Sequence, residues 1–107
     1  MPIEIVLTQG KLMIDNYPTE DELAKITIWP LKKTTDFIEL IEYIRTLWWM
    51  PEWGYKLVKN NLTLHTGGWS GNEEIIAALE KNWIFWSACW QKSTRGGHFW
   101  FKLPRRF

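Results

Sequence analysis

The sequence predicts an α+β fold, a single domain in which an antiparallel sheet of three hairpins packs against one or two main helices. Apolar residues recur at helical spacing in two segments, and short apolar runs come in adjacent pairs joined by turn residues. Neighbouring strands between helices favour an antiparallel sheet. The 107 residues are typical of one domain, which we divide into residues 1–30 and a main part, residues 31–104.

Each predicted hairpin has turn residues between its two strands. Gly10 in Gln9-Gly10 supplies the positive φ of a tight turn, and Asn60-Asn61 tolerates left-handed conformations. The segment "STRGG" (93–97) joins the last pair of strands. The three predicted pairs are 3–8 with 11–15, 55–59 with 62–66, and 83–92 with 98–103.

The first predicted helix is short and follows Pro18. Thr19 and Glu22 have the spacing of a capping box, in which each side chain accepts a hydrogen bond from the other's backbone N–H. Pro30 interrupts the helical signal after "TIW". We therefore expect this helix to be the last element of residues 1–30.

The main predicted helix runs from Asp36 to Trp49. Thr34 or Thr35 is its natural N-cap, and Pro51 is expected to end it. Its apolar residues recur three and four apart and form one stripe, which predicts a face buried in the core. The stripe consists of Phe37, Leu40, Ile41, Ile44, Leu47 and Trp48.

A glycine-rich segment, "TGGWSGNEE" (66–74), precedes the last predicted helix, at about 71–81. Such loops can bind phosphate where backbone N–H groups converge on a helix start. This one lacks the lysine and hydroxyl pair of a P-loop, however, and Ser70 and Glu73 have capping-box spacing. We interpret the loop as a structural corner that lets Trp69 fold against the helix. An anion-binding loop and an exposed Trp69 that contacts a protein remain the alternatives.

The composition favours a soluble cytoplasmic protein. The net charge is +1, so the chain as a whole is not drawn to nucleic acid or membrane. A single cysteine excludes an internal disulfide framework and suits a reducing compartment. The N-terminus does not resemble a signal peptide, and the longest apolar run is too short to span a membrane. The unusual feature is the nine tryptophans, because tryptophan is concentrated in cores and at binding hot spots.

No residue pattern indicates catalysis, a metal or a cofactor. Cys89 lies in "SACW", where a small buried residue is expected, and neither His65 nor His98 has metal-ligand spacing. Glu73 and Glu74 are adjacent, so they diverge on a helix and cannot form a facing carboxylate pair. The sequence therefore predicts a non-enzymatic protein without a cofactor.

The last predicted hairpin carries the main binding hypothesis. Strand alternation places one uniformly apolar face of it in the core. On the other face, the turn would set Trp90 opposite Trp100, Lys92 opposite His98, and Ala88 opposite Lys102. That face is either covered, with lysines reaching solvent at its edge, or an open aromatic and cationic surface. The candidate binding residues are Trp86, Trp90, Trp100, Lys92, Arg95, His98 and Lys102, with Trp49 and Trp53 as an extension and Trp69 as a loop candidate.

Three segments resemble a family of small hypothetical proteins encoded by bacteriophages. They are "LKKTTDFIELIEYIRTLWW", "TGGWSGNEEIIAALEKN" and "FWSACWQKSTRGGHFWFKLP", which together span about residues 31–104. The resemblance implies phage growth in a bacterial cytoplasm and implies no mechanism. Small phage accessory proteins often bind and block host enzymes, including defence nucleases such as CRISPR effectors.

We therefore expect a phage accessory protein that binds and inhibits or modulates a host protein. The first alternative is a small nucleic-acid-binding module that uses the Trp, Lys and His face. The second is a phage structural or self-assembling component. The sequence leaves the partner's identity and the oligomeric state open.

Overall fold

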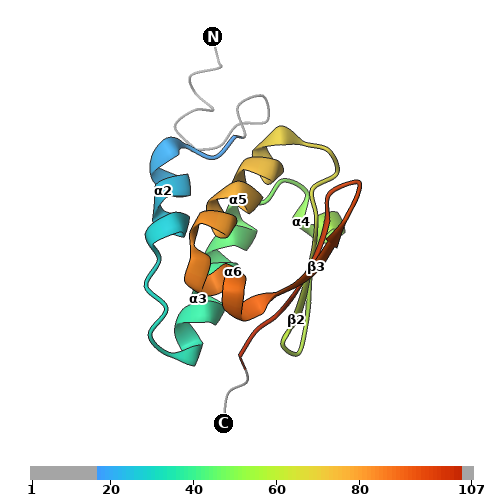
Figure 1. The fold of residues 1–107 in the computed structure, drawn as a ribbon. Helices are drawn as coiled ribbons and strands as arrows, with labels where there is room; N and C mark the ends of the chain where they lie inside the picture. The colour runs from blue at the N-terminus through green and yellow to red at the C-terminus, as the bar shows by residue number, and fades with distance from the viewer. Residues whose placement is uncertain (1–16, 105–107) are drawn as a thin grey trace.

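Two layers make up residues 17–104, the part of the chain that the computed structural model describes (Figure 1). One layer is a four-stranded antiparallel sheet, and the helices α2, α3, α5 and α6 lie together on one side of it. The predicted α+β fold with an antiparallel sheet is confirmed. The elements are α2 (Glu20–Ile28), α3 (Thr34–Leu47), α4 (Pro51–Gly54), β1 (Tyr55–Val58), β2 (Asn61–His65), α5 (Ser70–Lys81), α6 (Trp83–Cys89), β3 (Trp90–Thr94) and β4 (His98–Lys102).

The strand order is β1-β2-β4-β3, which joins two hairpins through the pairing of β2 with β4. The hairpin predicted over residues 3–15 lies outside the described residues, so the structure tests only the other two predicted pairs. In β1–β2 the turn is Lys59-Asn60 rather than Asn60-Asn61, and Lys59 takes the left-handed conformation with φ 57°. Asn60 instead anchors the chain after β4, since its side-chain nitrogen donates to the Leu103 carbonyl at 3.0 Å.

Helix α2 begins with the predicted capping box. The Thr19 hydroxyl accepts from the Glu22 N–H at 3.1 Å, and the Glu22 carboxylate accepts from the Thr19 N–H at 2.8 Å. At the other end, the Asn82 side-chain nitrogen donates to the carbonyls of Ile26 and Trp29, at 3.0 and 3.2 Å. The Ile26 carbonyl also accepts from the Trp29 N–H at 3.3 Å, so Asn82 adds a second partner to Ile26 and supplies one to Trp29 from the junction of α5 and α6.

Helix α3 buries the whole predicted apolar stripe. Its predicted N-cap is wrong, because the helix already includes Thr34 and begins after Lys33. Asp36 performs the capping instead, since its carboxylate accepts from the N–H groups of Lys32 and Lys33 at 2.8 and 3.0 Å. These backbone hydrogen bonds lower the pKa of Asp36.

Residues 83–89 form a helix, α6, so the long strand predicted over 83–92 is wrong. Asn82 caps this helix by accepting from the Phe85 N–H at 3.3 Å. Phe85 and Cys89 are four residues apart, and the helix therefore turns both into the core. An apolar run without a clear period is compatible with either element, and the cap decides between them here.

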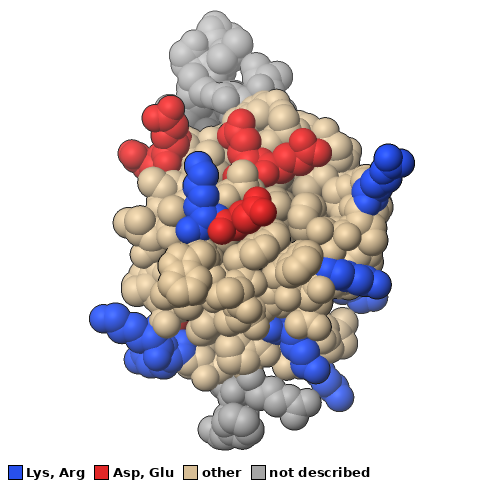
Figure 2. Space-filling view, viewed as in Figure 1, with Lys and Arg blue, Asp and Glu red and all other residues tan. Residues whose placement is uncertain are grey.

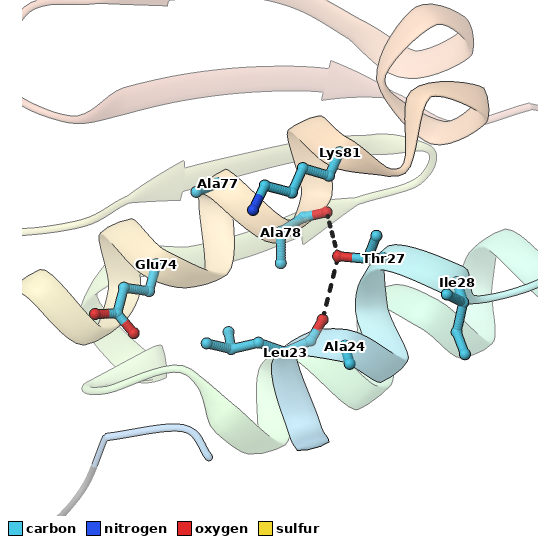
Figure 3. A pocket seen from close by; sticks show the side chains of 8 residues that line it. All are labelled: Leu23, Ala24, Thr27, Ile28, Glu74, Ala77, Ala78 and Lys81. Atoms are coloured by element: carbon cyan, nitrogen blue, oxygen red, sulfur yellow. Dashed lines mark hydrogen bonds between the residues drawn. The ribbon is translucent and has the colours of Figure 1, made fainter. Parts of the chain in front are cut away.

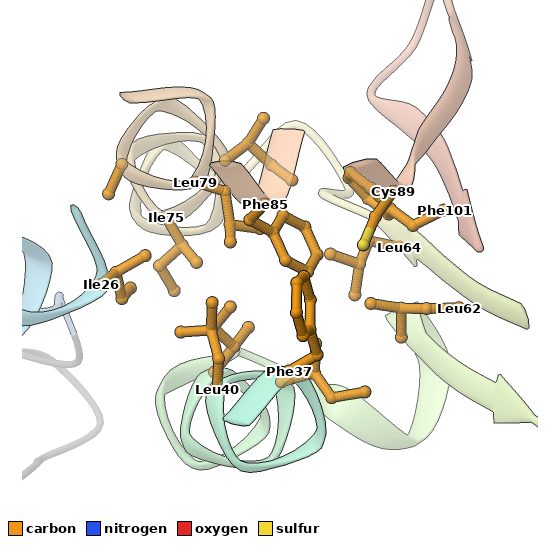
Figure 4. Close-up of a cluster of buried hydrophobic side chains, with 14 of the residues drawn as sticks. Ile26, Phe37, Leu40, Leu62, Leu64, Ile75, Leu79, Phe85, Cys89 and Phe101 are labelled. Atoms are coloured by element: carbon orange, nitrogen blue, oxygen red, sulfur yellow. The ribbon is translucent and has the colours of Figure 1, made fainter. Parts of the chain in front are cut away.

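The core lies between the helices and the inner face of the sheet (Figure 4). Phe85 of α6 joins the two layers, because its ring centroid is 6.3 Å from Phe37 of α3 and 5.5 Å from Phe101 of β4. The buried apolar residues come from α2, α3, β2, α5, α6 and β4 and their flanks. They are Ile26, Phe37, Leu40, Ile41, Ile44, Leu47, Trp48, Leu62, Leu64, Ile75, Ile76, Ala78, Leu79, Phe85, Cys89, Phe101 and Leu103.

Candidate functional site: the outer face of the sheet

The strand register defines which residues point away from the helices. Leu62 pairs with Phe101 and Leu64 with Phe99, and these four pack in or against the core. Side chains alternate along a strand, so the residues between them face the opposite way. We call this side the outer face. Its residues are Lys56, Val58, Asn61, Thr63, His65, Lys92, Thr94, His98, Trp100 and Lys102.

The described acidic residues are confined to helices, whereas basic residues occur in both layers. Every Asp and Glu of residues 17–104 lies in α2, α3, α4 or α5, and residues 53–72 and 81–104 contain none. In Figure 2 the acidic side chains gather over the helices, and only basic ones project where the sheet lies, along the right-hand margin. The strands and their turns carry Lys56, Lys59, Lys92, Arg95 and Lys102. The sheet side therefore attracts anions although the net charge is only +1.

Four aromatic rings form a continuous cluster on the outer face. The His65 ring centroid is 6.0 Å from Trp53, 6.4 Å from Trp100 and 4.7 Å from His98. The His98 and Trp100 centroids are 6.3 Å apart. Trp53 comes from α4 and is 57% exposed, whereas the other three rings are half-buried against their neighbours. We call these four residues the outer ring cluster.

His65 and His98 meet at the centre of this cluster. They are cross-strand partners, and their Nδ1 atoms are 2.6 Å apart. A hydrogen bond between two imidazoles needs one nitrogen with hydrogen and one without, so the pair does not favour two protonated rings. Partial burial lowers the pKa of His65, and the neighbouring charge of a protonated His98 lowers it further.

The outer face brings together five of the predicted binding residues. Four of them project from β3 and β4, namely Lys92, His98, Trp100 and Lys102. The fifth, Trp53, lies on the same face because its ring packs against His65. The predicted cross-strand pairs between β3 and β4 are wrong. Lys92 pairs with Trp100 rather than with His98, and Trp90 pairs with Phe101 rather than with Trp100. Gln91 is the extra residue between these two pairs, and it shifts the phase of the strand. Arg95 lies in the β3–β4 turn, at the end of this face.

Trp86 and Trp90 lie elsewhere, at the β3 edge on the helix side. Their rings stack with centroids 6.0 Å apart and planes 14° apart, and Trp86 also packs against Phe99 and Phe101. Trp90 remains 41% exposed. In the helix that precedes β3, Trp83 is 71% exposed and Ile84 is 46% exposed. We call Trp83, Ile84 and Trp90 the edge patch.

Trp49 and Trp69 belong to a third cluster, around the glycine-rich corner. Their rings stack with centroids 5.2 Å apart, and Tyr17 lies 4.8 Å from Trp69 on the same cluster. The buried Asn72 side chain accepts from the Trp49 N–H at 2.8 Å, which ties α5 to the chain after α3. The capping box predicted for α5, between Ser70 and Glu73, is wrong. Ser70 is the first residue of the helix, and its hydroxyl forms a hydrogen bond with the Tyr17 hydroxyl instead.

Cys89 does not form a reactive site. Its side chain is fully buried at the end of α6, and burial raises the pKa of its thiol to about 12. A thiol with this pKa carries almost no thiolate at neutral pH. Within residues 17–104, no group of three or more His, Cys, Asp or Glu side chains could hold a metal ion. No helix in this part of the chain is long and apolar enough to cross a membrane.

A shallow groove of about 420 Å³ lies between α2 and α5 (Figure 3). Small side chains form much of its wall, and Glu74 and Lys81 lie toward its two ends. The Thr27 hydroxyl lies within 3.3 Å of the carbonyls of Leu23 and Ala78, which its hydrogen can reach one at a time. The groove follows from the close approach of two helices and does not touch the outer face.

Of the outer ring cluster, His65 is the residue that the sequence prediction left out of the binding surface. The sequence "LTLHT" does indicate which way His65 points, because Leu62 and Leu64 alternate with Thr63 and His65 and so place His65 on the face away from the core. Only the pairing of β2 with β4 brings His65 opposite His98, and that pairing is not visible in the sequence. No family model, no curated protein and no solved structure matches this chain.

Proposed function

We propose that the protein binds single-stranded nucleic acid on the outer face of its sheet. One observation supports this above all: an open sheet face holds the exposed Trp53 and the half-buried Trp100 among lysines, and the strands and their turns carry no carboxylate. Aromatic side chains stack unpaired bases, and lysines follow the phosphates. A carboxylate on such a face would repel the phosphates.

The width of the sheet favours a single strand over a duplex. The major groove of DNA admits a helix or a two-stranded ribbon, whereas this face is four strands wide. Trp53 and Trp100 are the candidate stacking residues, with Lys92 and Lys102 beside them as phosphate contacts. In this proposal the protein is a non-enzymatic accessory protein, and the phage setting comes from the sequence resemblance alone.

Binding of a labelled single-stranded oligonucleotide, measured by fluorescence anisotropy at several salt concentrations, tests the proposal. Trp100→Ala is expected to weaken binding by about 1–3 kcal/mol, the usual loss for one stacked base. Trp83→Ala is the matched control, because it removes a more exposed tryptophan from the edge patch. Equal affinities of the two variants, or no binding by the wild-type protein at low salt, would contradict the proposal.

A second candidate function, inhibition of a host protein, is favoured by the edge patch. Trp83, Ile84 and Trp90 expose apolar surface that a partner protein could cover, and tryptophan is a frequent hot-spot residue. Trp90→Ala and Trp83→Ala are then expected to reduce capture of a host protein from nuclease-treated lysate, while Trp100→Ala leaves it unchanged. Self-association through the same patch would appear as a dimer in light scattering and would disappear in Trp83→Ala.

A further inference from the structure

His65 and His98 are the only two histidines of the chain, and the register of β2 and β4 sets them directly opposite each other. Their rings meet at 73°, and their Nδ1 atoms converge to 2.6 Å. Imidazole nitrogens are the commonest protein ligands of transition metals. We infer that this histidine pair is a binding site for a divalent copper, nickel or zinc ion, a role independent of nucleic-acid binding.

The change that binding requires is small. In the metal-free pair one ring carries a hydrogen on Nδ1 and the other offers a lone pair there. A metal needs lone pairs on both Nδ1 atoms, so the first ring moves its hydrogen to Nε2. Both rings stay neutral, and the number of hydrogens on the pair does not change. Metal–nitrogen distances of about 2.0–2.1 Å require the two nitrogens to separate slightly, which rotation of the side chains provides.

The surroundings favour neutral imidazoles and a particular group of ions. The charged groups on the packed elements are the cations Lys56 on β1, Lys92 on β3, Arg95 in the turn and Lys102 on β4, and the carboxylate Glu52 on α4. Burial and the neighbouring His98 lower the pKa of His65. Two nitrogen ligands without a carboxylate suit copper, nickel and zinc, whereas magnesium and calcium take oxygen ligands.

The site differs from a structural zinc site in the number of its ligands. Zinc in structural sites has four protein ligands, and the described residues provide only this pair. The remaining coordination positions are therefore left to water or to atoms of a bound partner. Binding is expected to be weaker than in a closed site and to follow the general order in which copper exceeds nickel and zinc.

The test titrates the wild-type protein with copper, nickel, zinc or magnesium chloride in a buffer that does not bind metals. Copper and zinc are expected to raise the melting temperature with concentration, EDTA to reverse this, and magnesium to have no effect. Copper is also expected to quench tryptophan fluorescence, because Trp53 and Trp100 lie against His65. His65→Gln and His98→Gln should each weaken binding by about tenfold or more, since loss of a mere outer-shell partner already costs that much.

Thr94→Ala is the matched control, because Thr94 pairs with His98 on the outer face and offers no nitrogen ligand. It should bind copper like the wild-type protein. Equal responses of the wild-type protein and both histidine variants would overturn the inference, and so would a wild-type protein that does not respond. If a variant fails to fold, zinc must still shift the ring NMR resonances of both histidines in the wild-type protein. Resonances that stay in place refute the site.

Discussion

The ammonium nitrogen of Lys92 lies 4.7 Å from the ring centroid of Trp100, within the range of a cation–π contact. The two residues are cross-strand partners on the outer face, because the irregularity at Gln91 changes the phase of β3. A base that stacks on Trp100 would place its phosphate near this lysine. The contact therefore keeps a cation ready beside the candidate stacking ring.

Lys92→Gln is expected to weaken binding of a single-stranded oligonucleotide and to reduce the slope of log affinity against log salt by about 0.7, the value for one lost phosphate contact. Its effect on the free energy of unfolding should stay below about 1 kcal/mol, because the contact is exposed. Lys32→Gln is the control, since Lys32 is an exposed lysine before α3 on the helical side. A slope that Lys92→Gln leaves unchanged would exclude this lysine as a phosphate contact.

Stability is expected to fall as the pH drops below about 6.5, the ordinary pKa of histidine. The pKa of His65 is lowered in the folded protein, so the unfolded chain binds the proton more readily. The contribution of His65 to the free energy of unfolding is therefore fully present above about pH 6.5, and it is lost as the pH falls from 6.5 towards the lowered pKa. Melting temperatures at pH 7.5, 6.5 and 5.5 measure this, and His65→Gln should flatten the dependence.

A second titration distinguishes the histidine from the carboxylates. The pKa of Asp36 is also lowered, by the N–H groups of Lys32 and Lys33, but its window lies below about pH 4. Asp36→Asn should therefore lower the melting temperature by a constant amount between pH 5.5 and 7.5, without changing the pH dependence there, and its difference from the wild-type protein should shrink below about pH 4. If His65→Gln kept the full decrease between pH 7.5 and 5.5, another group would have to cause it.

Asn82 is expected to be among the most sensitive polar residues. Its buried side chain makes three hydrogen bonds, to the carbonyls of Ile26 and Trp29 and from the N–H of Phe85. Asn82→Ala should lower the free energy of unfolding by about 2 kcal/mol or more, measured by urea denaturation, because the Trp29 carbonyl and the Phe85 N–H lose the bonds that this side chain makes with them.

Asn82→Asp separates the two functions of this side chain. Aspartate is as good an N-cap as asparagine, so a role limited to capping α6 would tolerate it. A carboxylate has no N–H for the carbonyls of Ile26 and Trp29, so we expect the variant to be nearly as unstable as Asn82→Ala. Wild-type stability of Asn82→Asp would show that the link to α2 contributes little.

The parts of the fold that depend on local sequence were predictable. The apolar stripe of α3 and the capping box of Thr19 and Glu22 each lie within a few turns of chain, and both are present. The helix formed by "WIFWSAC" was not predictable, because its apolar residues follow neither the two-residue period of a strand nor the 3.6-residue period of a helix clearly. Its helix depends on Asn82, whose other hydrogen bonds reach α2 more than fifty residues away.

The candidate site was predictable in composition and not in arrangement. Trp100, Lys92 and His98 were expected on one face, and they share it. Trp86 left that face because its segment is a helix, and Trp90 left it because Gln91 shifts the strand. A shift of one residue turns every following side chain to the other face, so an error of that size in the register changes which residues form the site.

The glycine-rich corner gives the last prediction. Gly71 lies in the first turn of α5, and a β-carbon there would collide with the ring of Trp69, which stacks on Trp49. Helix propensity alone favours alanine over glycine by about 1 kcal/mol. We nevertheless expect Gly71→Ala to destabilise the protein by about 1–3 kcal/mol, the usual effect of overpacking, because the ring must leave its stack.

Ser70→Ala and a double variant complete this test. Ser70 is exposed and does not cap the helix, so its replacement should change the free energy of unfolding by less than about 0.5 kcal/mol. In the Trp69→Ala background the collision is gone, and Gly71→Ala should become neutral or stabilising, which gives a clear coupling energy between the two positions. Additive effects of Gly71→Ala and Trp69→Ala in urea denaturation would mean that the ring does not occupy the space over Gly71.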